Sequence, residues 1–295
     1  MPPSRRQKRA VLKKRAVKGP FIKILALILI ILLGFFYIEL NTKYWNGEDK
    51  LGIAIQNSTG EVLVTLLDPE LSEETIFLIP GNTEVDVAKN LGTITIGNVQ
   101  KLGINEGIGG VLLPKTITKS FLFPVYLWSD REPNDFKFVT SKNSNIPLGD
   151  RIAILLFAKR VRLDRSKIDL GKSQFLIKTK LSDGTAGYKI TESIFQRLTF
   201  YFSENEFSEE EGTRVYIKDA TEAFDLAQKV GEIVEVMGAK VVAIEKIQKE
   251  DIECVIGGKD KEAVVKISRL FNCEIDKNTN FEFDVEIKLG SKFFL

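Results

Sequence analysis

The chain has 295 residues, of which 44% are hydrophobic and 28% are charged, and it contains no histidine. This composition is ordinary for a globular protein, and the lack of histidine excludes Ser-His-Asp and Cys-His catalysis as well as His-ligated zinc or iron. The two cysteines, Cys254 and Cys273, cannot form a structural zinc site by themselves. They are able to form one disulfide in an extracytoplasmic compartment, or to remain two buried thiols.

Charge is distributed unevenly along the chain. The net charge is +2, yet the first 23 residues hold nine of the 42 basic residues and no acidic residue. The rest therefore carries 33 basic and 40 acidic residues, a net charge of −7. Because the body is mildly acidic, we expect no nucleic-acid partner.

A strongly apolar segment follows the basic tail. Twelve of the fifteen residues from 24 to 38 are Leu, Ile or Phe, which favours bilayer insertion by about 4–7 kcal/mol. Residues 21–40 are numerous enough to cross about 30 Å of hydrocarbon as a helix. Tyr37, Tyr44 and Trp45 follow at the far end, where interfacial aromatic residues are common. We predict a transmembrane helix over 21–40.

The basic tail, residues 1–20, sets the predicted orientation. Its Lys and Arg residues precede the span, so the positive-inside rule places the N-terminus in the cytoplasm and the folded part outside the cell. A cleaved signal peptide would have a shorter apolar stretch followed by small residues, and residues 37–45 offer no such site. The sequence thus predicts a single-pass protein of the cell membrane with a retained signal-anchor.

Short apolar runs alternate with turn residues between residues 48 and 205, which we take as one extracytoplasmic domain. A Gly-rich turn at 107–110 opens a predicted helix with Pro114 near its first turn. The acidic run at 204–211 is interpreted as a linker. Further helices are predicted over 151–161 and 191–202, and strands over 51–55, 61–67, 75–80, 93–97, 125–129 and 173–181.

The last segment, residues 212–295, shows the clearest periodicity. Apolar residues recur at helical spacing through 221–238, from Phe224 to Met237, and Gly238 marks the end of that helix. The expected order is strand 214–218, helix 221–238, strands 239–247 and 252–257, helix 259–271 and strand 283–289. The sequence therefore predicts an α/β protein: a mixed-sheet domain followed by a small two-layer β-α-β-β-α-β domain.

Several stretches of both segments match the pattern of one family. The C-terminal segment contains DLAQKVGEIVEVMG, AKVVAIEKI and FDVEIKLGSKFF, and the earlier one contains LVTLLDPELSEETIFLIPGNTEVDV (63–87) and KLGINEGIGGVLLPKTITKSF (101–121). Together they resemble the LytR-CpsA-Psr family of bacterial envelopes, with residues 212–295 similar to the LytR C-terminal domain. The Asn-Gly-Thr-Gly turn usual in that domain reads Lys-Asp-Ala-Thr at 218–221 here.

The resemblance implies a transferase that moves a lipid-pyrophosphate-linked glycopolymer onto peptidoglycan, using arginines for the pyrophosphate and acidic residues for magnesium. This chain departs from that pattern at the decisive positions. Ser58 and Gly60 replace an Arg and an Asp, Gly81 and Asn82 replace another Arg and Asp, and Gly103 replaces an Asn, whereas Lys101 is retained. Because losing one transition-state donor costs about 10²–10³ in rate, we expect a pseudoenzyme without a cofactor and with no catalytic or metal-binding residue.

Basic residues are the remaining candidates for ligand binding. We single out Lys101, Lys115, Lys159, Arg160 and Arg162. The last three, with Arg165 and Lys167, either meet an anionic glycopolymer or lipid headgroup or form a solvated helix end. Asp68 is a metal ligand or part of an Asp-Pro turn. Residues 80–83 and 107–110 either offer backbone amides to an anion or are plain turns.

Three functions stay open at the level of sequence. The first is a non-catalytic envelope module that binds wall glycopolymer or peptidoglycan. The second is an active glycopolymer–peptidoglycan ligase that uses magnesium and residues we cannot align. The third is a scaffold that contacts only other envelope proteins. The expected partners are accordingly the lipid bilayer and a glycopolymer, peptidoglycan or an envelope protein.

Overall fold

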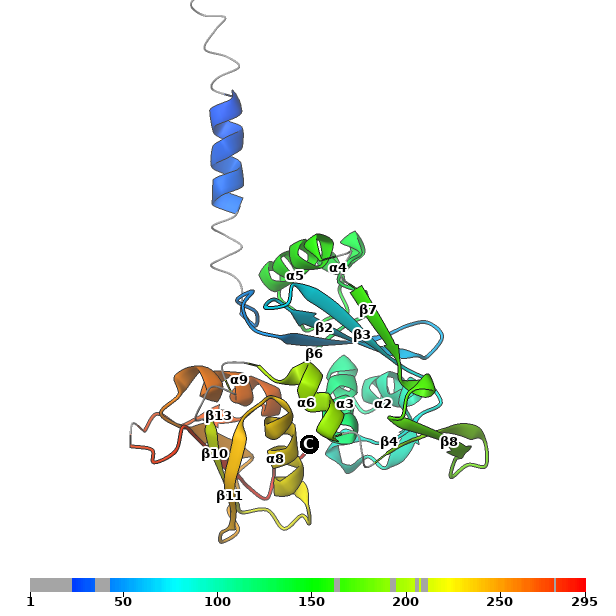
Figure 1. The fold of residues 1–295 in the computed structure, drawn as a ribbon, viewed down its shortest axis with the longest axis vertical. Helices are drawn as coiled ribbons and strands as arrows, with labels where there is room; N and C mark the ends of the chain where they lie inside the picture. Colours follow the sequence, from blue (N-terminus) through cyan, green and yellow to red (C-terminus); the bar gives the residue numbers. More distant parts are fainter. Residues whose placement is uncertain are drawn as a thin grey trace, which may run out of the picture.

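The computed structural model describes residues 23–34, 43–161, 165–191, 195–204, 207, 212–278 and 280–295. Residues 23–34 form a helix that stands apart from the rest of the molecule (Figure 1) and exposes its apolar side chains. No helix among the described residues is both long enough and apolar enough to span a bilayer. The remainder of 21–40 lies outside the described residues, as do tail 1–20 and Arg162, so the transmembrane helix stays a prediction.

The first unit, residues 43–204, is built on a five-stranded mixed sheet. Its order is β6-β1-β2-β3-β7, in which β1, β2 and β3 are antiparallel neighbours and the two edge strands run parallel to β1 and β3. The strands are β1 (Leu51–Gln56), β2 (Val62–Asp68), β3 (Glu73–Ile79), β6 (Leu127–Ser129) and β7 (Arg165–Asp169). All seven residues of β2 are buried, as expected for a central strand with both faces covered.

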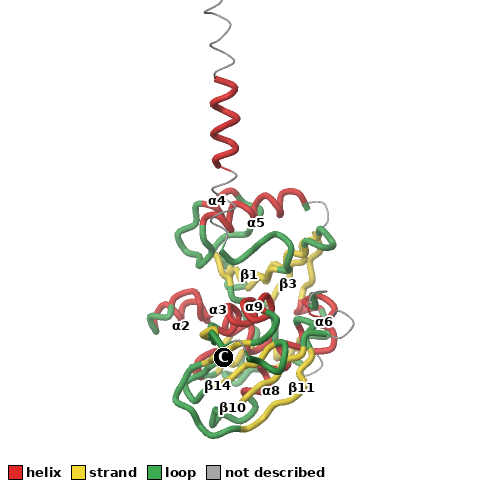
Figure 2. Tube along the Cα trace, turned by 90° about the vertical axis from the view of Figure 1, so that its left-hand side faces the viewer, coloured by secondary structure: helices red, strands yellow, loops and turns green. Residues whose placement is uncertain are grey.

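Helices cover both faces of this sheet (Figure 2). One face carries α4 (Phe136–Val139) and α5 (Leu148–Arg160). The other carries α2 (Val99–Asn105), α3 (Leu112–Phe121) and α6 (Phe195–Phe202). Short elements join them: β4 (Glu84–Asp86), η1 (Ala88–Asn90), β5 (Thr93–Thr95), η2 (Ile96–Asn98), η3 (Gly109–Val111), η4 (Leu170–Lys172), β8 (Leu176–Lys180) and β9 (Ala186–Ile190). Strands β4 and β5 form one hairpin, and β8 and β9 form another.

Each face of the sheet has its own core. Between the sheet and α5, Trp45 packs edge-to-face on Phe157 with ring centroids 5.3 Å apart. On the opposite face, Phe77 stacks on Phe202 at 5.6 Å, and Phe123 lies 5.0 Å from the same ring. Aromatic pairs at these separations add to the burial energy of their large side chains. The first unit is therefore a three-layer α/β/α arrangement.

The second unit, residues 212–295, contains another five-stranded sheet, in the order β11-β10-β14-β12-β13. Only the β12–β14 pairing among these is antiparallel. Its elements are β10 (Arg214–Asp219), α8 (Leu226–Val236), β11 (Lys240–Lys246), β12 (Cys254–Gly257), α9 (Lys261–Phe271), β13 (Glu274–Ile275) and β14 (Val285–Leu289). The expected order is found with one extra two-residue strand, β13. The expected start of α8 is wrong, because Asp225 takes a left-handed conformation and leaves Phe224 outside the helix and 93% exposed.

The two units share one continuous core. The buried cluster beneath the first sheet extends through α8 and α9 into the second sheet. The ammonium of Lys266 on α9 lies 3.0 Å from the Asp49 carboxylate and 2.7 Å from that of Glu204, both in the first unit. The amide of Lys89 also donates to the carbonyl of Leu295 over 2.8 Å. The mixed α/β class predicted from the sequence is confirmed.

Candidate functional site

Three glycines occupy the place where the family resemblance predicts a pyrophosphate site. Gly60 and Gly81 lie on the loops that follow β1 and β3, and Gly97 lies in η2, which follows β5. A Cβ atom on Gly81 would lie 2.6 Å from the carbonyl oxygen of Gly60, and a Cβ on Gly97 would lie 2.9 Å from that oxygen. The amide of Gly97 donates to the carbonyl of Gly81 over 2.9 Å. Because the backbones touch, position 81 has no room for an arginine unless a loop moves.

The hollow beside these glycines, which we call the glycine cleft, carries no positive charge. Its volume is about 580 Å³, and its lining consists of Thr59, Gly60, Glu61, Pro80, Gly81, Asn82, Thr95, Gly97 and Asn98. The Glu61 carboxylate accepts hydrogen bonds from Asn57 and Thr59, so it is held at the rim. No group of three or more acidic or cysteine residues in the described part of the chain could hold a metal ion. The lining offers a diphosphate no guanidinium group and no ammonium group.

The predicted ligand-binding residues do not converge on that cleft. Lys101 is exposed on α2, and Lys159 and Arg160 are exposed at the end of α5. Lys115 lies on α3, in a different cleft described below.

Two further charged residues suggested by the sequence have structural partners. The Asp68 carboxylate lies 2.9 Å from the Lys50 ammonium and accepts a hydrogen bond from the amide of Leu71, so it closes a turn. Arg165 forms a 2.7 Å ion pair with the buried Glu74, whose pKa is raised by burial. Arg165 therefore does not belong to a free basic cluster.

Lys115 belongs to a cleft between the two units, which we call the basic cleft. Its volume is about 460 Å³. Its three charged lining residues, Lys43, Lys115 and Arg269, are all basic and come from the segment before β1, from α3 and from α9. The uncharged lining is Tyr44, Val111, Val125, Tyr126, Asn145, Ser268, Leu270, Asn272 and Cys273.

In the basic cleft, the ring of Tyr44 contacts two of the three cations. The Lys43 ammonium lies 4.9 Å from the centre of the Tyr44 ring, and the Arg269 guanidinium carbon lies 5.9 Å from it. Tyr44 rests edge-to-face on Tyr126 at 5.8 Å. Burial raises the pKa of Tyr126, so its hydroxyl stays neutral and the cleft keeps its positive charge.

Lys115 is placed where a counter-ion would be favourable. Its pKa is lowered first by burial and then by the charge of Lys89, while Glu253 opposes the shift. No ion pair within the described residues joins a carboxylate to Lys43, Lys115 or Arg269. A bound anion would compensate both the lost hydration and the like-charge repulsion. The chemistry that this cleft can perform is therefore the binding of a negatively charged group.

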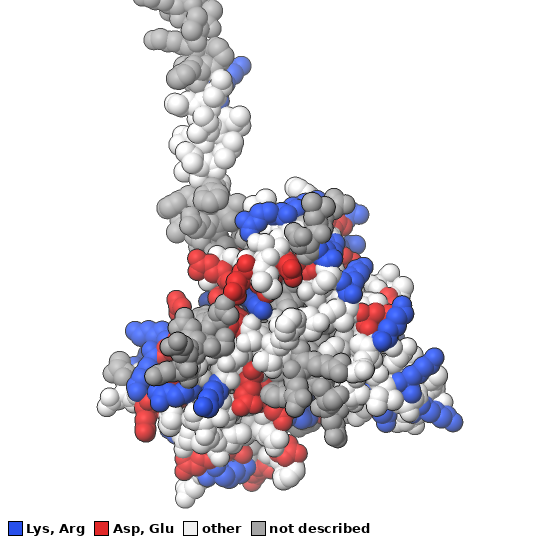
Figure 3. All heavy atoms as spheres, viewed as in Figure 1, with Lys and Arg blue, Asp and Glu red and all other residues white. Residues whose placement is uncertain are grey.

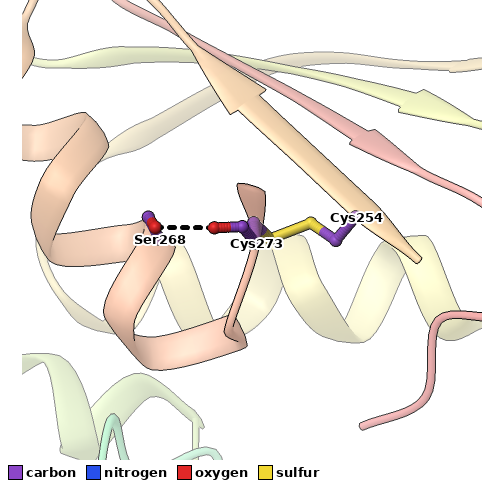
Figure 4. Close-up of a disulfide and its surroundings, with 3 residues drawn as sticks. All are labelled: Cys254, Ser268 and Cys273. Carbon is purple, nitrogen blue, oxygen red and sulfur yellow. Dashed lines mark hydrogen bonds between the residues drawn. A yellow bond between two sulfur atoms is a disulfide. The ribbon is translucent and has the colours of Figure 1, made fainter. Parts of the chain in front are cut away.

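A disulfide lies at the end of α9 (Figure 4), the helix that includes Arg269. Cys254 on β12 is bonded to Cys273, which follows α9, across a sequence separation of 19. The hydroxyl of Ser268 donates to the carbonyl of Cys273 over 2.8 Å, and the Cys273 amide donates back to the Ser268 carbonyl over 3.0 Å. Closing a loop of this length stabilises the fold by about 3 kcal/mol in the chain-entropy model.

A larger hollow between the units has mainly acidic charged residues in its lining, in contrast to the basic cleft. It encloses about 720 Å³ and its charged lining residues are Glu84, Asp86, Lys119, Lys229, Glu232 and Glu235. Lys119 already pairs with Asp86 at 2.9 Å. With four carboxylates and two ammonium groups, this hollow is less suited to an anion than the basic cleft.

Comparison with known proteins gives matches among solved structures. No protein-family model matches the chain, and no curated protein matches it either. The crystal structure of Bacillus subtilis TagV is 11% identical, with a TM-score of 0.38, and the match covers 51% of this chain and 94% of that one. TagT bound to LIIa-WTA is 10% identical, with a TM-score of 0.33 and coverages of 54% and 91%.

A third match is the LytR-CPS2A-psr family protein YwtF (TagT) with bound octaprenyl pyrophosphate lipid, which is 10% identical. Its TM-score is 0.32, and the match covers 53% of this chain and 90% of that one. At such identities and TM-scores the likeness does not say which residues act in this chain. The similarity of residues 212–295 to the LytR C-terminal domain stays a prediction. The solved structures that the chain resembles are those of LytR-CpsA-Psr proteins, the family that its sequence resembles.

Proposed function

We propose that the chain is a membrane-anchored cell-envelope protein that holds an anionic wall glycopolymer in the basic cleft without catalysing its transfer. The observation that carries this proposal is the set of Lys43, Lys115 and Arg269, three cations around one cleft with no ion-pair partner among the described residues. The predicted signal-anchor over 21–40 would hold the cleft outside the cytoplasmic membrane, where such polymers are assembled.

The chemistry of a polyanion supports this choice of ligand. Phosphate groups repeated along a polymer bind through charge-assisted hydrogen bonds, which are the strongest type available to Lys and Arg. The cleft is open to solvent between two units, so a long chain could lie across it with only a few repeats in contact. Lys115 gains most from such a ligand, because its ammonium group is half-buried and lies near the like charge of Lys89.

The glycine cleft supports the non-catalytic part of the proposal. Transfer from a lipid pyrophosphate requires stabilisation of charge on the leaving phosphate by guanidinium groups or a divalent ion. The lining of the glycine cleft offers a single charged side chain, that of Glu61, and it has the wrong sign. The close approach of Gly81 to Gly60 also leaves no space for the missing arginine.

Binding is tested with the full chain in nanodiscs and fluorescently labelled wall teichoic acid. The double variant Lys115→Gln/Arg269→Gln is expected to raise Kd at least about tenfold, because two charge-assisted contacts are lost. The matched control Lys178→Gln/Lys180→Gln removes two exposed cations of β8, outside the cleft, and should leave Kd unchanged. An equal rise in Kd for both double variants would show that the polymer is attracted to any surface cation. No binding by the wild type would favour the scaffold function.

Catalysis is tested separately with a lipid-linked polymer and Mg²⁺. We expect no release of polyprenyl phosphate above the protein-free blank. Release that depends on the protein would overturn the non-catalytic part and favour the ligase function.

A further inference from the structure

The helical layer formed by α4 and α5 has an apolar outer face. The inward residues of α5, among them Ile154 and Phe157, belong to the core above the sheet. Outward, Leu148, Ile152 and Leu156 recur at every fourth position and so lie on one side of the helix. Leu148 is 51% exposed and Leu156 is 61% exposed, while Ile152 is partly buried.

The neighbouring helix extends this apolar surface and adds the most exposed aromatic ring of the layer. Phe136, the first residue of α4, is 72% exposed. Such a side chain in water is unfavourable by about 2 kcal/mol relative to an apolar surrounding. We call the surface made by Phe136, Leu148, Ile152 and Leu156 the α4–α5 face.

Exposed basic side chains lie in the same layer as the α4–α5 face. Figure 3 shows Lys and Arg gathered over α5 at the end of the molecule from which the N-terminal helix rises. Between residues 130 and 161 the exposed basic residues are Arg131, Lys137, Lys142, Lys159 and Arg160, whereas Asp135 is the exposed acidic residue there. Lys159 and Arg160 form no ion pair with a described residue. Apolar groups with a basic rim are typical of surfaces that lie on anionic lipid.

The first residues of the first unit, 43–45, are hydrogen-bonded to α5. Asp150, fully buried in the first turn of α5, accepts hydrogen bonds from the backbone amides of Lys43, Tyr44 and Trp45 over 3.1–3.2 Å. The predicted span ends at residue 40, and Lys43 lies three residues further on. Three fully extended residues cover at most about 10 Å. If the predicted anchor crosses the membrane, α5 therefore begins close to the bilayer surface.

We propose that the α4–α5 face rests on the bilayer and binds anionic headgroups, with Phe136, Leu148 and Leu156 at the boundary of the acyl chains. The inference rests on the membrane anchor of the proposed function but does not require polymer binding. α5 is about 20 Å long, so it can lie flat and bring the cations at its end to the headgroups. The contact would fix the orientation of the molecule and hold the basic cleft, which includes Lys43, near the lipid surface.

The first experiment uses single spin labels on the full chain in nanodiscs. The two native cysteines are bonded to each other, so Leu156→Cys and Ile177→Cys each provide a single labelling site. Ile177 on β8 is 59% exposed and serves as the matched control. In discs of equal parts phosphatidylglycerol and phosphatidylcholine, the label at 156 should collide more with oxygen and severalfold less with a water-soluble nickel chelate than the label at 177. Equal accessibility at the two positions would overturn the proposal.

The second experiment tests the headgroup charge. Lys159→Glu/Arg160→Glu should return the label at 156 to aqueous accessibility, because each lost cation weakens attachment about fivefold. Lys178→Glu/Lys180→Glu, which changes two exposed lysines of β8, should have no effect. Attachment that is as strong in pure phosphatidylcholine discs would overturn the role of anionic lipid.

The two proposals fail in distinguishable ways. Failure of the full chain to co-elute with discs would remove the anchor, and with it both proposals. Loss of teichoic acid binding with an unchanged label at 156 would overturn the polymer function alone.

Discussion

Gly81 determines what the glycine cleft can hold. Its α-carbon faces the carbonyl of Gly60 so closely that any larger side chain must push against backbone rather than against a flexible side chain. Backbone shifts of this kind typically destabilise a protein by about 1–3 kcal/mol. The backbone of Gly60 therefore occupies the space that an arginine at position 81 would need.

We predict that Gly81→Ala lowers the melting temperature, because its Cβ would lie 2.6 Å from the oxygen of Gly60. Gly231→Ala is the matched control: it lies in α8, where the nearest atom to its Cβ would be 3.5 Å away, and alanine in a helix is favoured over glycine by about 1 kcal/mol. Thermal unfolding should show opposite signs for the two variants. A neutral Gly81→Ala variant would mean that the loops separate easily.

Of the three cations of the basic cleft, the sequence alone identifies one. Lys115 is a predicted ligand residue, but Lys43 and Arg269 are not, because they are separated by more than 200 residues and meet only through the packing of the two units. Lys159 and Arg160 lie at the end of α5, outside the basic cleft. A list of basic residues in a sequence does not say which of them share a cleft.

Among the elements, the β8–β9 hairpin depends on one carboxylate of β4. Glu84 accepts hydrogen bonds from the hydroxyl and the amide of Ser182 and forms a 3.1 Å ion pair with Lys189. The Ser182 hydroxyl, then its amide, then Lys189 lower the pKa of Glu84 to about 2. The ionised carboxylate thus joins the turn of the hairpin to β4.

Glu84→Gln is expected to destabilise the protein at pH 7 and to have little effect near pH 2. The folded pKa lies below the unfolded one, so the stabilisation by Glu84 is complete above the unfolded pKa and is lost as pH falls towards the folded value. Urea unfolding of both proteins across this range measures the difference. A difference that stays constant with pH would contradict the role of the charge.

The most apolar elements could be predicted, whereas some polar or glycine-containing ones could not. Strands β1, β2 and β3 and helices α5 and α9 follow from their hydrophobic patterns, within a few residues. Strand β7 reads Arg-Ser-Lys-Ile-Asp, which has no strand pattern of its own; it forms because it pairs with β3 at the sheet edge. Helix α2 is not predicted, because it has only seven residues and contains Gly103, whose Cα packs against the carbonyl of Gly109 with no room for a Cβ.

For the molecule as a whole, Lys266 joins the two units. It is 16% exposed between Asp49 and Glu204, which are 32% and 10% exposed. Removing the cation would leave two partly buried carboxylates close together, and breaking a buried ion pair costs about 3 kcal/mol or more. The shared core means that this loss should affect the stability of both units together.

We predict that Lys266→Met lowers the unfolding free energy by about 2–3 kcal/mol, reduced from the fully buried case because water still reaches the pair. Lys249→Met is the control, since it breaks a pair with Glu222 in which both side chains are more than half exposed, and should cost less than about 1 kcal/mol. Urea unfolding followed by tryptophan fluorescence and by far-UV circular dichroism measures both. Equal effects would contradict a joining role for Lys266.

The position of α6 has a consequence for how the first unit folds as the chain is synthesised. Phe202 covers Phe77 and Phe123, yet it is made more than 120 residues after Phe77. Those two rings therefore stay uncovered until α6 has been made. We expect a nascent chain that ends before residue 195 to be cleaved more readily by a protease than one that includes α6.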